Sequence, residues 1–160
     1  MSKYTLLGTD TINHLGVTLY RVKYKDGTLG GYIESYKNLS QDGNALVYGD
    51  ARVYGNAWVS GNALVYGDAR VYGNAWVSGN ALIRYFDEIK DTKNYFSIIG
   101  FQYNITVTYS SIHIGRRSYT LDELDTISCK KSNPEYINIE DIPMIKMMIE
   151  IALEKILRDI

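Results

Sequence analysis

The chain is poor in the residues that build cross-links and metal sites. Its 160 residues include one cysteine, Cys129, and two histidines, His14 and His113. A single cysteine excludes an internal disulfide and a multi-cysteine zinc site, and two histidines are too few for a histidine-rich metal site. We therefore expect no metal and no other cofactor.

An excess of charge of one sign and a long apolar run are also lacking. Seventeen basic and eighteen acidic side chains leave a net charge of -1, so no overall field attracts nucleic acid or an anionic membrane. The opening MSKYTLLGTD has no apolar signal core, and the most apolar stretch, residues 142–156, is interrupted by Lys146, Glu150 and Glu154. We expect a soluble, cytoplasmic protein that does not bind membranes.

Proline and phenylalanine are scarce, with two and three residues, whereas there are fourteen glycines and fifteen tyrosines. Much of this excess comes from one repeated segment. From Gly43 the chain reads GNALVY, GDARVY, GNAWVS, then the same three hexads again, and finally GNALIR. Residues 43–60 recur identically as 61–78, so a six-residue unit is nested within an 18-residue unit.

The hexad positions indicate short strands joined by tight corners. Ala and Val lie two residues apart and therefore point to the same side of a strand, which places Ala45, Val47, Ala51 and Val53 inside. Glycine tolerates a positive φ, and the following Asn or Asp favours turns. Three corners close one turn of 18 residues. Residues 43–84 are thus predicted to form a three-sided parallel β-helix, in which equivalent residues of successive coils stack about 4.8 Å apart.

These hexads resemble those of the hexapeptide-repeat left-handed β-helix superfamily, and within it the G-N-A-x-V-x proteins of phage and prophage genomes related to YdcK. The segment GTLGGYIESYKNLSQDGNA is similar to that group's entry into the helix. The resemblance implies a left-handed helix, although most parallel crossovers are right-handed. It also implies a phage or prophage origin and a location in the bacterial host cell.

The flanks predict a mainly β protein in three parts. Residues 1–42 are expected to form a β-hairpin cap, with strands at 4–7 and 17–25, and a degenerate first coil. Residues 43–84 form the hexapeptide-repeat β-helix. Residues 85–160 are expected to form an α+β module with strands at 95–101, 105–110 and 111–114.

Two helices are expected in the last part of the chain. Thr120 is suited to cap a first helix because Glu123 follows three residues later. Asp141 and Pro143 mark the start of a final long helix with an apolar stripe at helical spacing. Further apolar residues widen this stripe, so we expect burial on more than one side. The stripe is formed by Ile145, Met148, Ile149, Ala152 and Ile156, and the widening residues are Met144, Met147 and Ile151.

The residues that point outward from the β-helix form three unlike columns. They are predicted to bind a partner, because aromatic and arginine side chains are unusual in such density at solvent-facing positions. Two tryptophans in register make the flattest apolar strip. Either a partner or the chain's own C-terminal module is expected to cover this strip. The predicted binding residues are Trp58 and Trp76, Arg52 and Arg70, Tyr54 and Tyr72, and Tyr48 and Tyr66, with Arg84 beside them.

An enzyme is the first alternative, since the superfamily is best known for acyltransferases that use a histidine base near the coil. We predict no histidine in or beside the coils of this chain and no loop extruded from the repeat. His113 lies in the C-terminal module, where a structural role is expected. No catalytic residue is therefore predicted.

The sequence favours a non-catalytic binding protein that engages a host macromolecule through its β-helix faces. Inhibition of a bacterial defence system such as CRISPR-Cas is one concrete form of this hypothesis. A protein partner is expected, with self-association through the C-terminal module as a further possibility. Nucleic acid is less favoured because the net charge is close to neutral. The second alternative is a structural component of a virion or tail.

Overall fold

The computed structural model describes residues 2–101, 103–127 and 140–158. The chain divides into two compact units, Met1–Thr92 and Lys93–Ile160, which we call unit 1 and unit 2. Cys129 lies outside the described residues. Each unit is described by itself below.

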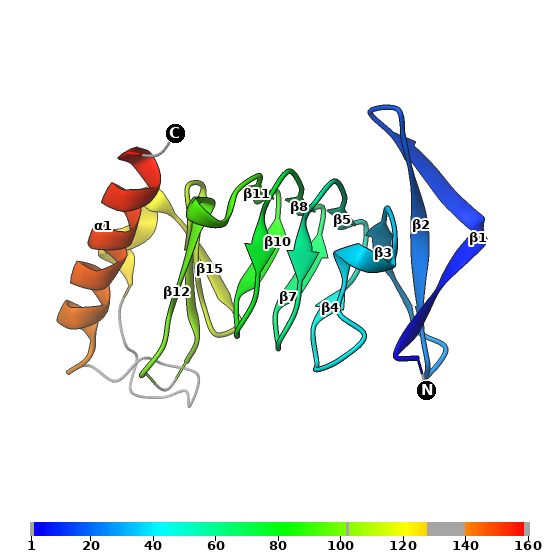
Figure 1. Cartoon of the computed structure of the whole chain (residues 1–160). Helices are drawn as coiled ribbons and strands as arrows, with labels where there is room; N and C mark the ends of the chain where they lie inside the picture. The colour runs from blue at the N-terminus through cyan, green and yellow to red at the C-terminus, as the bar shows by residue number, and fades with distance from the viewer. Residues whose placement is uncertain (1, 102, 128–139, 159–160) are drawn as a thin grey trace. The chain divides into compact units, whose positions relative to one another are not determined.

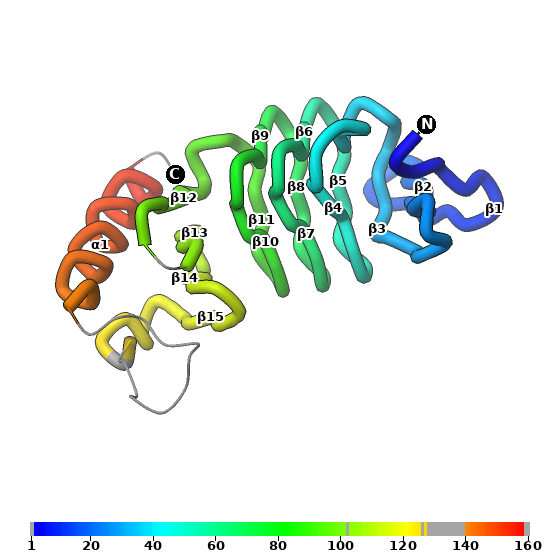
Figure 2. The backbone as a smooth tube through the Cα atoms, turned by 90° about the horizontal axis from the view of Figure 1, so that it is seen from below, coloured from blue at the N-terminus to red at the C-terminus, as the bar shows by residue number. Residues whose placement is uncertain are grey.

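Unit 1 contains a three-turn parallel β-solenoid, as the repeat predicts (Figure 1). Its coils lie side by side (Figure 2). The first two coils pass through three short strands each, and the third passes through two. Leu46 pairs with Leu64 and Leu64 with Leu82, so the register is the 18 residues of the sequence repeat. The strands are β4 Leu46–Val47, β5 Arg52–Val53, β6 Trp58–Val59, β7 Leu64–Gly67, β8 Arg70–Val71, β9 Trp76–Val77, β10 Leu82–Tyr85 and β11 Glu88–Ile89.

The solenoid core consists of the alanines and β-branched residues that the alternation places inside. Each of them is at most 1% exposed. Small alanines beside Val and Ile fill the narrow triangular interior, since a larger side chain at every inward position would not fit at native packing density. The inward residues are Ala45, Val47, Ala51, Val53, Ala57, Val59, Ala63, Val65, Ala69, Val71, Ala75, Val77, Ala81, Ile83 and Ile89.

The corner glycines adopt the backbone conformation that the sequence predicts. The glycine of every G-[ND] pair from Gly43 to Gly79 has a positive φ, between 64° and 72°. The coils also approach one another closely at some corners. A Cβ atom added to Gly73 would lie 2.5 Å from the carbonyl oxygen of Lys90, so only glycine fits there without a shift.

The solenoid continues beyond the expected boundary after Arg84. Tyr85 pairs with Gly67 and takes the corner position with φ 56°, and β11 then pairs in parallel with β8. Asp87 replaces the inward alanine, is 1% exposed, and accepts a hydrogen bond from the Arg84 amide at 3.1 Å. The last coil therefore keeps the fold while losing the G-N-A signature.

An N-terminal hairpin precedes the solenoid, as predicted. It consists of β1 Tyr4–His14 and β2 Val17–Tyr24, paired antiparallel. Strand β3 Leu29–Ile33 pairs with β2 on one edge and with β5 on the other, which gives the sheet order β1-β2-β3-β5-β8-β11. The hairpin thus extends one side of the solenoid as a continuous sheet.

The hairpin and the residues after β3 cover the open edge of the first coil. The carbonyl groups on this edge point away from the second coil and would otherwise lack partners. Backbone amides of Tyr32, Glu34 and Ser40 donate to three of these carbonyls. Side chains donate to other carbonyls on this edge. Lys3 Nζ donates to Ala45, Tyr24 Oη to Val47 and Arg21 Nη1 to Gly49. Asn38 Nδ2 donates to both Gly55 and Ala57. Asn38, at the end of the 3-10 helix η1 Tyr36–Asn38, is fully buried. These bonds give the predicted cap its physical basis, because an open solenoid edge templates aggregation.

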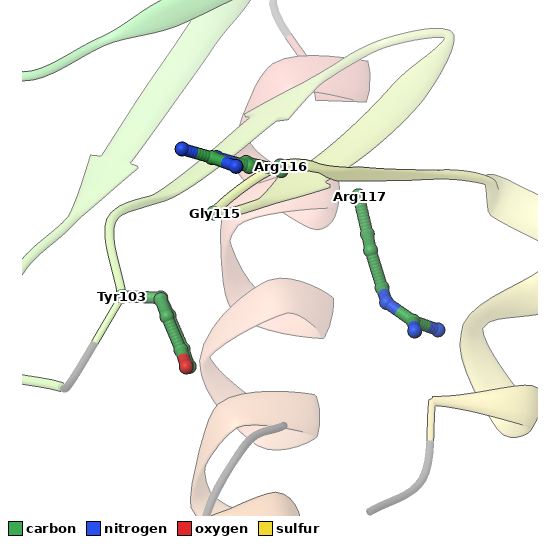
Figure 3. A pocket seen from close by; sticks show the side chains of 4 residues that line it. All are labelled: Tyr103, Gly115, Arg116 and Arg117. Atoms are coloured by element: carbon green, nitrogen blue, oxygen red, sulfur yellow. The ribbon is translucent and has the colours of Figure 1, made fainter. Parts of the chain in front are cut away.

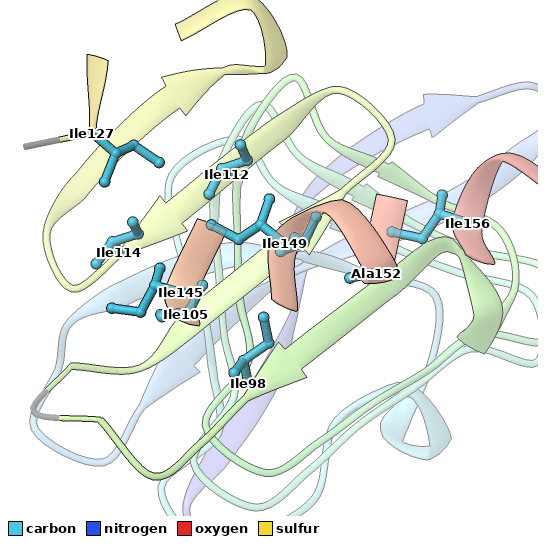
Figure 4. Close-up of a cluster of buried hydrophobic side chains, with 10 residues drawn as sticks. Ile98, Ile105, Ile112, Ile114, Ile127, Ile145, Ile149, Ala152 and Ile156 are labelled. Atoms are coloured by element: carbon cyan, nitrogen blue, oxygen red, sulfur yellow. The ribbon is translucent and has the colours of Figure 1, made fainter. Parts of the chain in front are cut away.

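Unit 2 is a four-stranded antiparallel sheet with one α-helix packed on it (Figure 4). The sheet order is β12 Tyr95–Ile98, β13 Ile105–Thr108, β14 Ser111–Ile114 and β15 Arg117–Thr120. Short 3-10 helices lie at η2 Thr92–Asn94 and η3 Leu121–Thr126, and α1 spans Ile142–Arg158. The core joins sheet residues to four helix residues, Ile145, Ile149, Ala152 and Ile156.

Three features of unit 2 differ from the expectations. Strand β15 was not foreseen, and the helix capped by Thr120 is a 3-10 helix, with Glu123 Oε2 accepting from the Thr120 amide at 2.9 Å. The expectation that α1 is buried on more than one side is wrong for the described residues. Met144, Met147 and Ile151 are 54–55% exposed, because one sheet covers only one side of the helix. No helix in the described residues combines the length and the apolarity needed to cross a membrane.

Candidate functional site

The solenoid presents three outward surfaces, each formed by one set of stacked strands. The first face carries the outward residues of β4, β7 and β10. The second face carries those of β5, β8 and β11, and the third face those of β6 and β9. These three faces hold all the predicted binding residues.

The third face holds the two tryptophans. Trp58 and Trp76 are Cα partners in the β6–β9 pair, as the 18-residue repeat predicts. Trp58 is half-buried, whereas Trp76 is 64% exposed, which is unusual for the largest aromatic side chain. The outward positions of both strands and their following serines carry no charge.

Asparagine ladders border the third face on both sides. On one side Asn56 Nδ2 donates to Asn74 Oδ1 at 3.3 Å. On the other side Asn62 Nδ2 donates to Asn80 Oδ1 at 3.0 Å. The hydrogen bonds fix these amides in successive coils, so the two tryptophans lie in a strip with a rigid polar border on both sides.

The second face combines arginines, a carboxylate and stacked rings. Arg52, Arg70 and Glu88 occupy equivalent positions in three successive coils, and Arg70 Nη1 binds Glu88 Oε1 at 2.8 Å. The rings of Tyr54 and Tyr72 stack with centroids 5.3 Å apart and an interplanar angle of 7°. Burial, followed by the neighbouring Tyr72, raises the pKa of Tyr54, so this hydroxyl stays protonated at neutral pH.

His14 reaches the second face from the end of β1. Its Nδ1 lies 3.1 Å from Arg52 Nη1, and its ring meets that of Tyr54 edge-on at 5.2 Å. The expectation that no histidine lies beside the coils is therefore wrong, because the sheet carries the hairpin across this side of the solenoid. Burial, and then the charges of Arg52 and Arg70, lower the pKa of His14, which Glu88 partly opposes.

The predicted residues of the first face are mainly engaged within the chain. Tyr48 lies 5.3 Å from the ring of Tyr24. Tyr66 accepts a hydrogen bond from Arg84 Nη1 at 2.6 Å. The expectation that Arg84 points outward to solvent is wrong: it is 3% exposed, and its guanidinium lies 5.3 Å from the Tyr85 ring. Among the predicted residues, those of the second and third faces remain the better candidates for binding.

His113 lies in the interior of unit 2. It is fully buried on β14, and its Nε2 and Nδ1 lie 2.9 and 2.8 Å from the hydroxyl oxygens of Ser111 and Ser118. Both ring nitrogens are thus within hydrogen-bonding distance of partners, and the ring is not presented to a substrate.

A small pocket in unit 2 lies beside Tyr103, Gly115, Arg116 and Arg117 (Figure 3). Its volume is about 160 Å³. Pockets for small molecules usually measure roughly 300–1,000 Å³, so this one is too small for a large cofactor. Within the described residues, no group of three or more His, Cys, Asp or Glu side chains is arranged to hold a metal ion.

Comparison with known families points to the solenoid alone. A family model described as the YdcK Beta solenoid repeat matches residues 45–61, 63–79 and 69–85. Over these coils the chain is similar to YdcK beta-solenoid repeats, as the hexads indicated. The third match extends to Tyr85, one residue beyond the predicted repeat, and neither the hairpin nor unit 2 is matched. No curated protein matches the chain.

Two parts of the candidate site were missed by reasoning from the sequence. The asparagine ladders could have been found, since Asn occupies the corner in two of every three hexads and the 18-residue repeat sets their stacking. The position of His14 could not, because the repeat says nothing of the path of the hairpin before it.

Proposed function

We propose that this chain is a non-catalytic binding protein whose solenoid displays a tryptophan face to a protein partner. The observation that carries the proposal is the 64% exposure of Trp76, in register with Trp58 on a rigid coil. Interfaces are enriched in tryptophan, and a few such anchors supply most of the binding energy. A rigid scaffold adds to this because little conformational entropy is lost on binding.

The lack of charge among the outward residues of β6 and β9 supports a protein partner over nucleic acid. Nucleic acid is bound largely through basic side chains that neutralise phosphates. The outward side chains of β6 and β9 include no basic residue, and the chain has a net charge of -1. Aromatic side chains within a polar border are instead the usual anatomy of a protein interface.

The test is affinity capture from a bacterial lysate with the tagged full chain. The variant Trp58→Ala/Trp76→Ala should lose most of the captured partner, while its circular dichroism stays that of the wild type. A matched control, Phe86→Ala, removes an aromatic side chain that is 79% exposed just after β10 and should capture normally. Equal capture by the double variant and the wild type would remove the tryptophan face from the proposal.

A phage or prophage origin, and inhibition of a bacterial defence system, are narrower forms of this proposal that follow from the resemblance of the repeats. They predict that the captured partner is a component of such a system and loses activity when bound. The alternative of an acyltransferase predicts binding of acetyl-CoA, which calorimetry measures directly.

Self-association is a second proposal, favoured by three exposed apolar side chains on α1, those of Met144, Met147 and Ile151. Exposed apolar patches of this kind mark interaction sites. Light scattering after size exclusion should show an oligomer that Met147→Glu dissociates. A monomeric wild-type chain would exclude it, together with a multi-subunit virion role.

A further inference from the structure

We propose that Arg52, together with His14, binds an oxyanion, a carboxylate or phosphate group carried by the protein partner. This inference rests on the proposed function, since it names the chemistry that the partner offers to the second face.

Arg52 and Arg70 lie in identical hexads but differ in their counterions. Arg70 binds Glu88 in the next coil at 2.8 Å. The neighbours of Arg52 at the same position are Tyr32 on one side and Arg70 on the other. Arg52 thus stands about 4.8 Å along the axis from a like charge, with no acidic residue at either equivalent position. In the described residues no carboxylate forms an ion pair with it.

Asp10 on β1 and Glu34 after β3 are already bound by other donors. Asp10 accepts from Arg21 Nε and from the Tyr32 hydroxyl, each at 3.1 Å. Glu34 Oε2 accepts from the Gly55 amide at 2.6 Å. Turning either carboxylate toward Arg52 would break these bonds. A carboxylate or phosphate group from outside the chain supplies the counterion of Arg52 without breaking these bonds.

His14 adds a hydrogen-bond donor to the same place. A guanidinium only donates, so His14 Nδ1 must accept from Arg52 Nη1, and the ring hydrogen then lies on Nε2. His14 Nε2 and Arg52 Nε are both buried, and neither has a hydrogen-bond partner in the described structure. Two buried donors without acceptors, beside an unpaired cation, destabilise this region by their desolvation. An oxyanion supplies acceptors of the kind that these donors lack, together with the missing negative charge.

The burial of these two donors predicts how the oxyanion enters. Because both donor atoms are buried, the side chain of His14 has to shift to admit an oxygen atom, and the residue that follows it, Leu15, lies in an exposed turn. Binding therefore changes the environment of His14, which provides a direct spectroscopic readout.

The test is an NMR titration of the full chain with inorganic phosphate and, separately, with acetate. The His14 ring signals and the Arg52 Nε–H signal should shift with a common saturation curve. Arg52→Gln should weaken this binding roughly tenfold or more, since charge-assisted hydrogen bonds are lost. Lys37→Gln removes the same charge from an exposed position on η1 and should leave the titration unchanged.

Several outcomes would overturn the proposal. They are an absence of saturable shifts at His14 with both anions, or the same titration curve for Arg52→Gln as for the wild type. A glutamate-rich peptide should compete with phosphate, whereas competition only by an oligonucleotide would overturn the assignment to a protein-borne group. Trp58→Ala/Trp76→Ala should bind phosphate normally. If this variant loses partner capture but still binds phosphate, the two proposals are separated. If the wild-type chain captures the partner but binds no phosphate, this proposal alone is refuted.

Discussion

The hydroxyl of Tyr24 and the backbone of Val47 hold each other through two hydrogen bonds. Tyr24 Oη donates to the Val47 carbonyl at 3.0 Å and accepts from the Val47 amide at 2.7 Å. One side chain thus replaces the two bonds that a neighbouring strand would supply to β4. Burial raises the pKa of Tyr24, so the hydroxyl keeps its hydrogen throughout the physiological range.

Tyr24→Phe should destabilise unit 1 by about 1–3 kcal/mol, because it leaves a buried amide and a buried carbonyl without partners. Chemical denaturation followed by circular dichroism measures this. Tyr20→Phe on the same strand is the control, since no hydrogen bond of the Tyr20 hydroxyl is present among the described contacts. Equal free energies of unfolding for the two variants would show that the side chain does not cap the solenoid.

Substitutions at two neighbouring corners should separate backbone strain from crowding. Gly73 and Gly79 have φ angles of 64° and 66°, so alanine at either costs roughly 1–2 kcal/mol of strain. Only Gly73 is also crowded: an added Cβ would lie 2.5 Å from the Lys90 carbonyl oxygen, whereas nothing lies within 4 Å at Gly79. Gly73→Ala should therefore lower the melting temperature more than Gly79→Ala. The reverse order would contradict the coil packing described above.

The hairpin turn carries a strained residue that can be relieved. Leu15 has φ 52° and is 82% exposed, and Gly16 follows with φ 82°. Asn-Gly is the preferred pair for a two-residue turn of this kind. Leu15→Asn should stabilise the chain by about 1 kcal/mol. Alanine tolerates a positive φ less well than asparagine does. Leu15→Ala should therefore give no comparable rise in the melting temperature.

The contact between His14 and Arg52 should make stability depend on pH. The pKa of His14 is lowered in the folded chain, so between that value and about 6.5 the unfolded chain binds more protons. The free energy of unfolding should therefore fall as the pH falls through this window and recover above it. His14→Gln should flatten the dependence, and because His113 is present in both chains, the difference isolates His14. Parallel pH profiles would rule out this contribution.

The solenoid could be predicted because its sequence repeats the same inward residues and the same corner residues in each coil. Ala45 and Val47 point inward by the two-residue alternation of strands, and Gly43 marks a corner by its tolerance of positive φ. An identical 18-residue copy then sets the register without further information. This is why Trp58 and Trp76 could be placed in register from the sequence.

The end of the solenoid was not predictable from the hexad pattern. Tyr85 adopts the left-handed conformation of a corner although it has a side chain, and Asp87 is buried where the repeat has alanine. Contacts between coils outweigh the preference of tyrosine for a negative φ and the preference of aspartate for an exposed position. Arg84 becomes buried with them, although the repeat alone places it at an outward position.

The non-repeating parts depend on contacts between residues distant in the sequence. The meeting of His14 with Arg52 follows from the pairing of β3 with β5, which no local pattern encodes. The exposure of Met147 on α1 likewise depends on how many layers cover the helix, and amphipathic spacing does not determine that number.

The most direct test of the central claim is hydroxyl-radical footprinting of the tryptophan face in the presence of the captured partner. Trp76 is largely exposed in the chain and should be oxidised rapidly when alone. Bound partner should protect Trp76 strongly while leaving the exposed Phe86 reactive. Unchanged oxidation of Trp76 at saturating partner would contradict the proposal that this face is the binding surface.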